Sequence, residues 1–511
     1  MEKTSRLKAL IQNYLNIKES TTNNTITIQD MDSIAVRLFK NELWYRGDPS
    51  ELHQFYTKYY NKMAKTMFWQ GESTTGVDFI KVHTGLPGII IDTLVDIVVD
   101  DLNEIVILSN EKDEKGNYQP FPEPTQRWKK ISEEHDFNKS ILKNAVKWAL
   151  MGDCAFKISF DREISEHPII EVIPGKDCDY QYKRGRYVGT KFYSTTIIDN
   201  KKLVLEETYD AEGVWYKLFN EEGKEMSVSM IEELYDLYPF AYNRGDLPIM
   251  AIPFVIMPSS KYIGRGKGIL ESKEGALDNL DEAWSQWVEA LRDGKTRTYI
   301  PETLVPTDPL TGQLLPPNTF DRRFIAVSSN MAENANNNIQ VESPTIQSES
   351  YLATYITALD LCLQGVISPS TLGIDVKKLD NAEAQREKEK ATLYTRSKIV
   401  SVLEEVIPKL VALTLQVDDY LNNNKQIRDY NVSVSFGEYA NPSFESKIET
   451  VAKARSGKVM SIERSVEELY GDSLTKEEKE AEIKRLKIEE GYTFEEPGIN
   501  QSDGTEDGID E

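Results

Sequence analysis

Two helical patterns, at residues 268–293 and 348–366, lie on either side of a long segment that has no helical period. The first pattern carries apolar residues at alternating three- and four-residue steps, which form one stripe on a helix. These residues are Leu277, Leu280, Trp284, Trp287 and Leu291. The opposite side carries the polar residues Asp278, Asp281, Glu282, Ser285 and Glu289. At about 100° per residue the two groups centre well over a right angle apart, as on an ordinary amphipathic surface helix. The pattern predicts a helix that packs along its apolar edge and turns its acidic edge toward water or a charged partner.

The segment between the two helices is too long for an ordinary connection. Its first part, residues 295–329, has strand candidates at TRTYI and RRFIAV. Its prolines are Pro301, Pro306, Pro309, Pro316 and Pro317. Residues 330–345 are polar and are interpreted as the return of the chain. Connections of this length in compact proteins are usually functional or small subdomains. We therefore expect the two helices to form the legs of a stalk that carries a small β-rich excursion.

Composition limits the classes of function that remain. The chain has 511 residues, 40% of them hydrophobic, which is enough for several folded domains. A formal charge of −24 excludes nucleic-acid binding through an overall basic field, although such a chain can surround nucleic acid without holding it. The N-terminus lacks a long apolar core, and the most apolar run, residues 85–108, carries four aspartates. We therefore expect neither a secretory signal nor a membrane span, and a soluble, intracellular chain.

The whole chain predicts a multi-domain α+β fold that is mainly helical. Residues 1–265 begin with helical patterns near 3–18, 29–43, 50–66, 85–106 and 138–152. Alternating segments such as IIEVIPG, KKLVLEETYD and GVWYKLFN follow between turn signals, and they predict an antiparallel sheet. MAIPFVIM, residues 250–257, is a continuous apolar run and predicts a buried strand.

A long helix is predicted at residues 382–423, with a charged first half and an apolar second half. Pro408 lies within the apolar half, where it removes one backbone hydrogen bond and forces a kink. Residues 430–490 begin with the strand NVSVSF and continue with helical patterns near 443–455, 461–470 and 474–490. The tail, residues 491–511, is acidic and rich in glycine, so we expect it to be disordered.

Two glycine-containing segments are candidates for phosphate or anion binding. Gly294-Lys295-Thr296 resembles the end of a phosphate-binding loop, but position 289 is glutamate where that loop requires glycine. The turn GRGKG, residues 264–268, follows a predicted strand and precedes a predicted helix. It either cradles an anion at the helix N-terminus or is a flexible turn that starts the helix.

Ionisable residues elsewhere form no visible active site. Asp92, Asp96 and Asp100 recur at four-residue steps, and a solvated or intersubunit acidic face explains them better than a two-metal site. The four histidines are His53, His83, His135 and His167, which are dispersed. The three cysteines are Cys154, Cys178 and Cys362, which have no metal-ligand spacing and are typical of structural thiols in a reducing cytoplasm. We expect no metal, no cofactor and no enzymatic activity.

The order of these parts resembles the portal proteins of tailed bacteriophages, of the siphophage type that infects Gram-positive bacteria. The residues that carry the resemblance are YIGRGKGILESKEGALDNLDEAWSQW, the Pro-rich excursion, GVISPSTLGIDVKKLDNAEAQREKEKATLYTRSKI and the helix that follows. It covers roughly residues 30–470, and the turn departs from the Gly-Arg-Ser form expected of the family. The N-terminal half is similar in layout more than in individual residues.

The resemblance implies a dodecameric ring at one capsid vertex, through which DNA enters and leaves the head of the virion. It also implies partners: double-stranded DNA, the terminase large subunit, scaffolding protein, major capsid protein and a head–tail connector protein. The implied parts are a wing (1–265), a stem (266–293 and 348–366), a clip (294–347), a tunnel loop (367–381), a long wing helix (382–429) and a crown (430–490).

Charge gives the two stem edges different expected roles. Each phosphate that Lys or Arg neutralises adds affinity through counterion release, so a basic bore would hold DNA. An acidic face of Asp278, Asp281, Glu282 and Glu289 would repel the DNA backbone, while the apolar stripe packs against the second helix and the neighbouring subunit. In the tunnel loop, Lys377 and Lys378 either touch phosphates transiently or are two solvated lysines.

Two other functions remain open. A nucleic-acid-processing enzyme with an oligomerisation stalk would need convergent carboxylates and a divalent metal. A coiled-coil scaffold or adaptor would need a heptad stripe over at least three or four heptads, whereas this stripe spans about two.

Overall fold

The computed structural model describes most of the chain. The described residues are 17–19, 26–28, 33–59, 67–71, 80–112, 118–198, 201–228, 240–241, 247–294, 297–301, 310, 324–327, 340–342, 345–374, 382–422, 427–437, 444–457, 459–470 and 476–489. The chain divides into two units, which are described separately. The first comprises Met1–Leu379 and Gln385–Gly437, and the second comprises Asp380–Ala384 and Glu438–Glu511. The mixed, mainly helical α+β fold with antiparallel sheets agrees with the sequence prediction.

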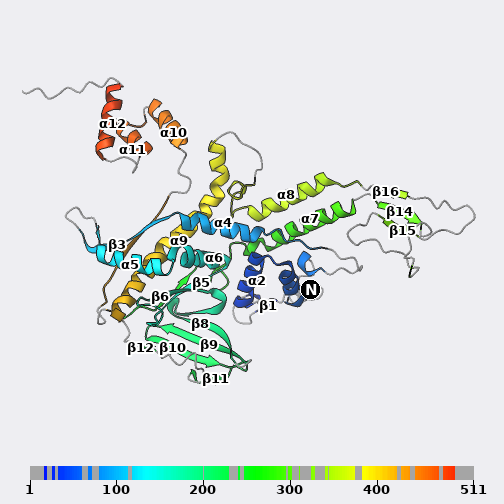
Figure 1. Ribbon diagram of the computed structural model, residues 1–511, viewed down its shortest axis with the longest axis horizontal. Helices are drawn as coiled ribbons and strands as arrows, with labels where there is room; N and C mark the ends of the chain where they lie inside the picture. Colours follow the sequence, from blue (N-terminus) through cyan, green and yellow to red (C-terminus); the bar gives the residue numbers. More distant parts are fainter. Residues whose placement is uncertain are drawn as a thin grey trace, which may run out of the picture. The chain divides into compact units, whose positions relative to one another are not determined.

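Six of the described helices lie in the body of the first unit, outside the α7–α8 hairpin described below (Figure 1). They are α2 (Ile34–Arg46), α3 (Pro49–Tyr59), α4 (Leu86–Asp100), α5 (Pro122–Glu134), α6 (Lys143–Met151) and α9 (Ala382–Asn422). Ser33 caps α2 by accepting the amide of Val36, and Gly47 ends it in the left-handed conformation that glycine tolerates. The apolar faces of α4 and α6 and the second half of α9 share one core with the strands around them.

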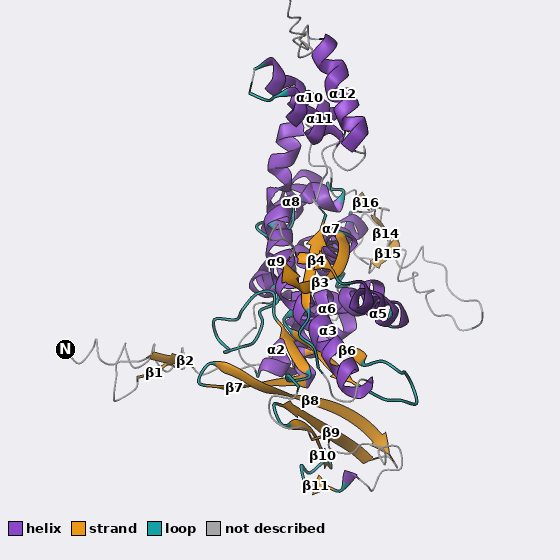
Figure 2. Ribbon diagram, turned by 90° about the vertical axis from the view of Figure 1, so that its left-hand side faces the viewer, coloured by secondary structure: helices purple, strands orange, loops and turns teal. Residues whose placement is uncertain are grey.

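Three antiparallel sheets complete the body of this unit. The first, in the order β13-β5-β6, consists of β5 (Cys154–Ser159), β6 (Ile169–Pro174) and β13 (Ala251–Phe254). The largest runs β11-β10-β9-β8-β7, with β12 beside β10, and Figure 2 shows its long strands side by side. Its strands are β7 (Cys178–Lys183), β8 (Arg186–Ile198), β9 (Lys201–Asp210), β10 (Gly213–Phe219), β11 (Glu225–Met226) and β12 (Phe240–Ala241). The strands predicted from KKLVLEETYD and GVWYKLFN are therefore confirmed.

The third sheet corrects a prediction. The helix expected at residues 85–106 ends at Asp100, and Leu102–Lys112 forms the strand β3. β3 pairs with β4 (Tyr118–Pro120) and with β17 (Asn431–Phe436), in the order β17-β3-β4. The run from Ile105 to Ile107 is β-branched, which favours a strand where a partner is present. That partner comes from more than 300 residues later in the chain, so a local helical pattern could not reveal it.

Near the N-terminus, the short strands β1 (Ile17–Glu19) and β2 (Ile26–Ile28) pair in an antiparallel hairpin. The helix expected at 3–18 therefore cannot extend beyond residue 16, and the rest of it lies outside the described residues. The helix expected at 50–66 is α3, whose last described residue is Tyr59.

The two predicted stalk helices form an antiparallel hairpin, α7 (Glu274–Asp293) and α8 (Ser348–Leu363). At one end the Lys273 ammonium donates to the Leu361 carbonyl, and at the other a side chain at Gly294 would collide with Ile346. α7 begins six residues later than expected, after the short 3₁₀ turn Glu271–Lys273. Beyond the hairpin, β14 (Arg297–Pro301) and β15 (Phe324–Val327) confirm the two strand candidates and pair with each other. β14 also pairs with β16 (Gln340–Glu342), which lies in the segment interpreted as the return of the chain and was not predicted.

The second unit contains the helices α10 (Phe444–Ser456), α11 (Ile462–Tyr470) and α12 (Lys476–Glu489), close to their predicted positions. Val451, Ile462 and Val466 are buried in it, and Lys479 pairs with Glu467. β17, which the sequence grouped with these helices, belongs to the first unit instead. Residues 491–511 lie outside the described residues.

Candidate functional site

The apolar edge of α7 packs against α8, as the stripe predicted. Leu277 and Leu280 are buried in the core of the unit. Farther along, the ring centroids of Trp284 and Trp287 lie 5.7 Å apart, and Tyr355 of α8 lies 5.5 and 6.4 Å from them. Edge-to-face aromatic pairs of this kind stabilise a contact beyond the area that they bury. Leu291, the last member of the stripe, is 51% exposed.

The opposite edge of α7 is not the open acidic face that the sequence predicted. Asp278 and Asp281 are 4% and 1% exposed, so the expectation that they face water or DNA is wrong. The Asp278 carboxylate accepts the backbone amides of Phe68 at 2.8 Å and Trp69 at 3.3 Å. These residues belong to the 3₁₀ turn η1 (Phe68–Gln70), which covers this side of the helix.

Asp281 binds the same covering layer through more contacts. Its carboxylate accepts the indole N–H of Trp69 at 3.2 Å and both the amide and the hydroxyl of Thr84 at 2.9 Å. His83 Nδ1 lies 2.7 Å from it. One turn farther along α7, the Ser285 hydroxyl accepts the amide of Val82 at 2.9 Å. Residues 67–71 and 80–84, here called the α7 strap, thus lie on α7 through side-chain-to-backbone hydrogen bonds.

Physical chemistry explains why carboxylates occupy this buried face. A buried backbone N–H without a partner is costly, and a carboxylate can accept several such donors at once. Burial raises the pKa of Asp278 to about 6, and the amides of Phe68 and Trp69 oppose that rise. Helical periodicity tells which side of α7 these residues occupy, but it does not tell what covers that side.

The other two predicted acidic residues remain accessible. Glu282 is half-buried and accepts the side-chain amide of Gln286 at 2.9 Å. Glu289 is also half-buried, and its carboxylate lies 3.5 Å from the Arg292 guanidinium. The acidic edge of α7 therefore retains only part of the surface charge that its sequence predicted.

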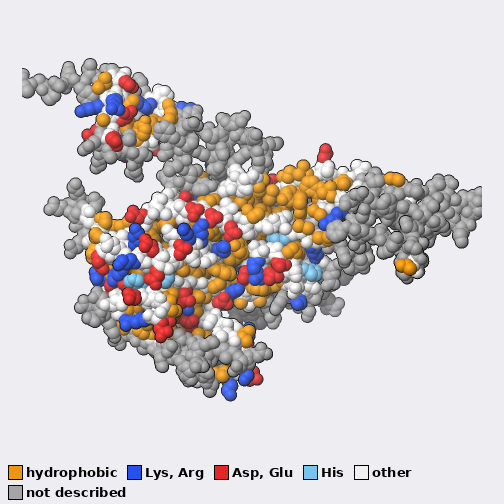
Figure 3. Space-filling model, in the orientation of Figure 1, with side chains coloured by type: hydrophobic (Ala, Val, Ile, Leu, Met, Phe, Trp, Pro, Cys, Tyr) orange, Lys and Arg blue, Asp and Glu red, His pale blue; other side chains and the backbone are white. Residues whose placement is uncertain are grey.

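The outer side of α8 is an exposed apolar ridge. Leu352 is 47% exposed and Ile356, one turn farther along, is 41% exposed. Figure 3 shows hydrophobic side chains gathered along the hairpin of α7 and α8. Contiguous exposed apolar surface commonly marks a protein–protein contact. We call Leu352 and Ile356 the α8 ridge.

A groove runs between α7 and α8 and has a volume of about 650 Å³. Its α7 wall includes Ala283, Gln286 and Ala290, and its α8 wall includes Ser350 and Thr354. Ala283, Ala290, Ser350 and Thr354 are small, so a neighbouring helix can approach closely there, while Gln286 and Tyr351 line the groove with longer side chains. At about 100° per residue, Ser350 and Thr354 lie on nearly the opposite side of α8 from the ridge. We call this feature the hairpin groove.

The structure tests the predictions of a tunnel loop and of a kink at Pro408 only in part. Lys377 and Lys378 lie outside the described residues. The preceding 3₁₀ turn, Pro369–Leu372, is held to α9 because Thr392 accepts the amide of Ser368 and bonds to Thr371. Pro408 lies inside α9, as expected, and the kink itself stays a prediction.

The GRGKG turn is structural. Arg265 is buried, and its guanidinium donates to the Asp153 carboxylate at 3.0 and 2.8 Å and to the carbonyls of Cys178 and Gly175. Asp153 also accepts the amide of Gly266 at 2.7 Å. Arg265, one of the two cations of the turn, is therefore committed to an internal carboxylate, which favours the helix-starting turn over the anion cradle.

The remaining candidates also have internal partners. Asp96 and Asp100 pair with Lys143, and Asp92 pairs with Lys147, so the acidic stack faces α6 of the same subunit. Gly294 ends α7, while Lys295 and Thr296 lie outside the described residues. Among the described residues no group of three or more His, Cys, Asp or Glu could hold a metal ion. The three cysteines are buried and free, and burial raises the pKa of Cys362 to about 12.

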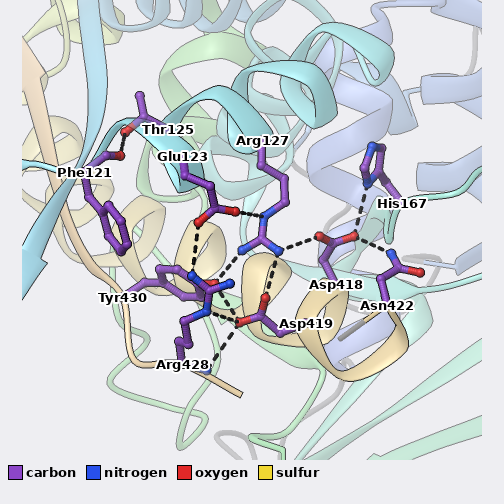
Figure 4. A network of polar contacts seen from close by, with 10 residues as sticks. All are labelled: Phe121, Glu123, Thr125, Arg127, His167, Asp418, Asp419, Asn422, Arg428 and Tyr430. Atoms are coloured by element: carbon purple, nitrogen blue, oxygen red, sulfur yellow. Dashed lines mark hydrogen bonds and ion pairs between the residues drawn. The ribbon is translucent and has the colours of Figure 1, made fainter. Parts of the chain in front are cut away.

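Sequence reasoning missed the polar network at the end of α9 (Figure 4). The Arg127 guanidinium of α5 lies 2.8 Å from Asp419 and 3.2 Å from Asp418, both buried. Tyr430 donates to Asp419 at 2.6 Å, and His167 Nδ1 lies 3.1 Å from Asp418. The network joins α5, α9 and the segment before β17. No local pattern could have revealed it, because its members are spread over about 300 residues.

No helix among the described segments is long and apolar enough to cross a membrane.

Comparison with known proteins finds no relative of this chain. No protein-family model matches the chain, and no curated protein matches it either.

Proposed function

We propose that this chain is the portal protein of a tailed bacteriophage. In this proposal twelve copies form a closed ring at one capsid vertex, the terminase motor packages genomic DNA through the ring, and the DNA later leaves by the same route. The number twelve comes from the family resemblance. The observation that carries the proposal is the α7–α8 hairpin, which bears an exposed apolar ridge on one side and a groove on nearly the opposite side.

Symmetry links this hairpin to a ring. A two-fold dimer joins the same patch on both subunits, whereas two different complementary patches give head-to-tail contacts that close into rings or extend into filaments. The α8 ridge and the hairpin groove are such a pair: Leu352 and Ile356 of one copy would enter the groove of the next. The alternative, a coiled-coil dimer, would instead join the same face of the two subunits.

The remaining parts take the roles that the resemblance implies. The β14–β16 sheet beyond the hairpin would meet the terminase large subunit during packaging and the head–tail connector protein afterwards. The body of the first unit would face scaffolding and major capsid proteins. Glu282 and Glu289 would face the bore, and Lys377 and Lys378 would contact DNA transiently. The protein would be made in the bacterial cytoplasm and act in the virion, without catalysis, cofactor or metal.

Electron microscopy of the purified chain in negative stain tests the proposal. We expect closed rings with a central hole. The double variant Leu352→Asp, Ile356→Asp should give open or monomeric particles, because it buries two charges in an apolar contact. The control is Ile164→Asp, which makes the same change at a residue that is 74% exposed and lies away from the hairpin. Rods or two-fold dimers from the unaltered chain, or rings from the double variant, would contradict the proposal.

A further inference from the structure

A second groove lies in the body of the first unit, away from the α7–α8 hairpin. It has a volume of about 800 Å³ and lies between α9 and β13. The α9 wall presents Val402, Val406 and Leu413, and the facing wall includes Ile249 and Ile252. Several of these apolar side chains are only half-buried. We call this feature the α9 groove.

The dimensions of the α9 groove suit a short helix. Its α9 wall extends from Val402 to Gln416, which is about 21 Å at 1.5 Å per residue. A helix of fourteen residues has about the same length. The opposite wall is an edge strand, but Pro253 in its middle has no amide proton to donate. An added strand would therefore pair poorly there, whereas a helix brings its own backbone hydrogen bonds.

The N-terminal end of α2 lies at the rim of this groove. Arg37, in the first turn of α2, donates to the Gly266 carbonyl at 2.8 Å and stacks 4.7 Å from the ring centroid of Tyr262. The same 258–266 turn contributes Pro258, Gly264 and Arg265 to the groove wall. The chain that precedes α2 therefore starts beside the groove.

The β1–β2 hairpin limits how far the first residues can lie from that rim. Ile17 pairs with Ile28, so these two Cα atoms are about 5 Å apart. From Ile28 to Ser33 the chain spans at most about 18 Å when fully extended. Residue 16 thus remains within about 27 Å of Ser33, where α2 begins, in its own subunit. This geometry favours the same chain over a neighbouring copy.

The sequence before β1 has the pattern that such a groove requires. Apolar residues recur at the steps i, i+3, i+4, i+7 and i+8, which form one face of a helix. They are Leu7, Leu10, Ile11, Tyr14 and Leu15. Between residues 3 and 16 the charged residues are Lys3, Arg6 and Lys8, in a chain of net charge −24. On the α9 wall of the groove, Glu405 pairs with Lys409, so the match rests on the apolar residues.

We propose that residues 3–16 form an amphipathic helix that occupies the α9 groove of the same subunit. Leu7, Leu10, Ile11, Tyr14 and Leu15 face the half-buried Val402, Ile249 and Ile252, and the basic residues face water. The N-terminus thereby fastens the middle of the long helix α9, around Pro408, to the sheet that contains β13. The proposal does not depend on the ring or on DNA.

Disulfide formation in the full-length chain tests it. The native cysteines are buried, so mild oxidation reports on introduced thiols. We expect Ile11→Cys combined with Val402→Cys, or with Ile252→Cys, to give an intrachain disulfide that migrates faster in a non-reducing gel. Two controls should stay reduced: Asn13→Cys with Val402→Cys, on the opposite side of the proposed helix, and Ile11→Cys with Ile197→Cys. Ile197 lies ten residues beyond Tyr187 of the groove along β8, about 33 Å away.

The results distinguish residues 3–16 of the same subunit from the same residues of another copy as the occupant of the α9 groove. A covalent dimer would overturn the proposal, because it would show that the segment comes from another copy. Failure of both test pairs to exceed the controls would also overturn it. As a second measurement, deletion of residues 1–16 should raise the maleimide reaction rate of a Val402→Cys chain at least five-fold. An unchanged rate in that deletion variant would show that these residues do not cover the groove.

Discussion

Replacing Asp281 by alanine should destabilise the first unit, because it removes the acceptor that holds the α7 strap. The buried Trp69 indole N–H and the half-buried Thr84 amide would lose their partner, together with the Thr84 hydroxyl and the contact with His83. A buried donor left unsatisfied costs about 1–3 kcal/mol, and removal of one member of a buried charged cluster costs about 3–5 kcal/mol. We expect a loss of about 3–5 kcal/mol for Asp281→Ala.

Thermal unfolding of the purified full-length chain is the assay. A loss of this size should lower Tm on the order of 5 °C in a unit of this size. Glu282→Ala is the matched control, since it removes a carboxylate from the adjacent position, where the half-buried side chain bonds, among the described residues, only to Gln286 on its own helix. We expect that variant to stay within about 0.5 kcal/mol of the unaltered protein. Both variants must be compared at one protein concentration, because assembly shifts the apparent stability.

The same pair of variants distinguishes the two interpretations of the acidic edge. If Asp281 lined a DNA channel, as its helical position suggests, Asp281→Ala would leave Tm unchanged and alter the amount of DNA packaged per particle. Equal Tm values for Asp281→Ala and Glu282→Ala would refute the α7 strap as a stabilising element. A conservative Asp281→Asn variant should fall between the two, because an amide keeps one acceptor oxygen but directs its NH₂ group toward donors.

Two further variants examine the hairpin. Burial raises the folded-state pKa of Asp278 to about 6 from an ordinary value near 3.8, so the stabilisation due to this group is greatest below pH 4 and is lost as the pH rises toward 6. The Tm difference between the unaltered protein and Asp278→Asn should therefore decrease from pH 4 to pH 6, and a difference that increases would contradict the assignment. Trp284→Ala should cost about 3–5 kcal/mol by opening the cluster with Trp287 and Tyr355. Faster amide exchange in α7 and α8 would report the loss, and unchanged exchange would show that the cluster does not hold the hairpin together.

The spacing of apolar residues and the positions of turn-forming residues predict most helices and strands of this fold. α7, α8 and α9 lie close to their expected positions because their apolar residues repeat at helical steps over many turns. β3 was mistaken for part of a helix because its apolar run continues that of α4, and its partner β17 lies more than 300 residues away. Local pattern cannot supply a pairing over that distance.

The candidate site illustrates a different limit. The sequence distinguished the two edges of α7 correctly and predicted the contact of Trp284 and Trp287 with the second helix. It assigned Asp278 and Asp281 to solvent, because carboxylates are rarely buried unless they are paired. Their partners here are mostly backbone amides of the α7 strap, which carry no side-chain signature. Buried acceptors of backbone donors are therefore hard to recognise in a single sequence.

The burial of Asp278 and Asp281 leaves the electrostatic argument for the proposed channel standing. α7 and α8 together carry eight carboxylates and one arginine, Arg292. Without the two buried aspartates, six carboxylates against one arginine remain on the hairpin. In a ring of such hairpins the stem would still carry a net negative charge at every subunit, so few phosphates would gain a cationic partner and few counterions would be released. DNA that binds weakly to the wall can be moved in either direction, and that property follows from the charge of the whole hairpin more than from any one residue of α7.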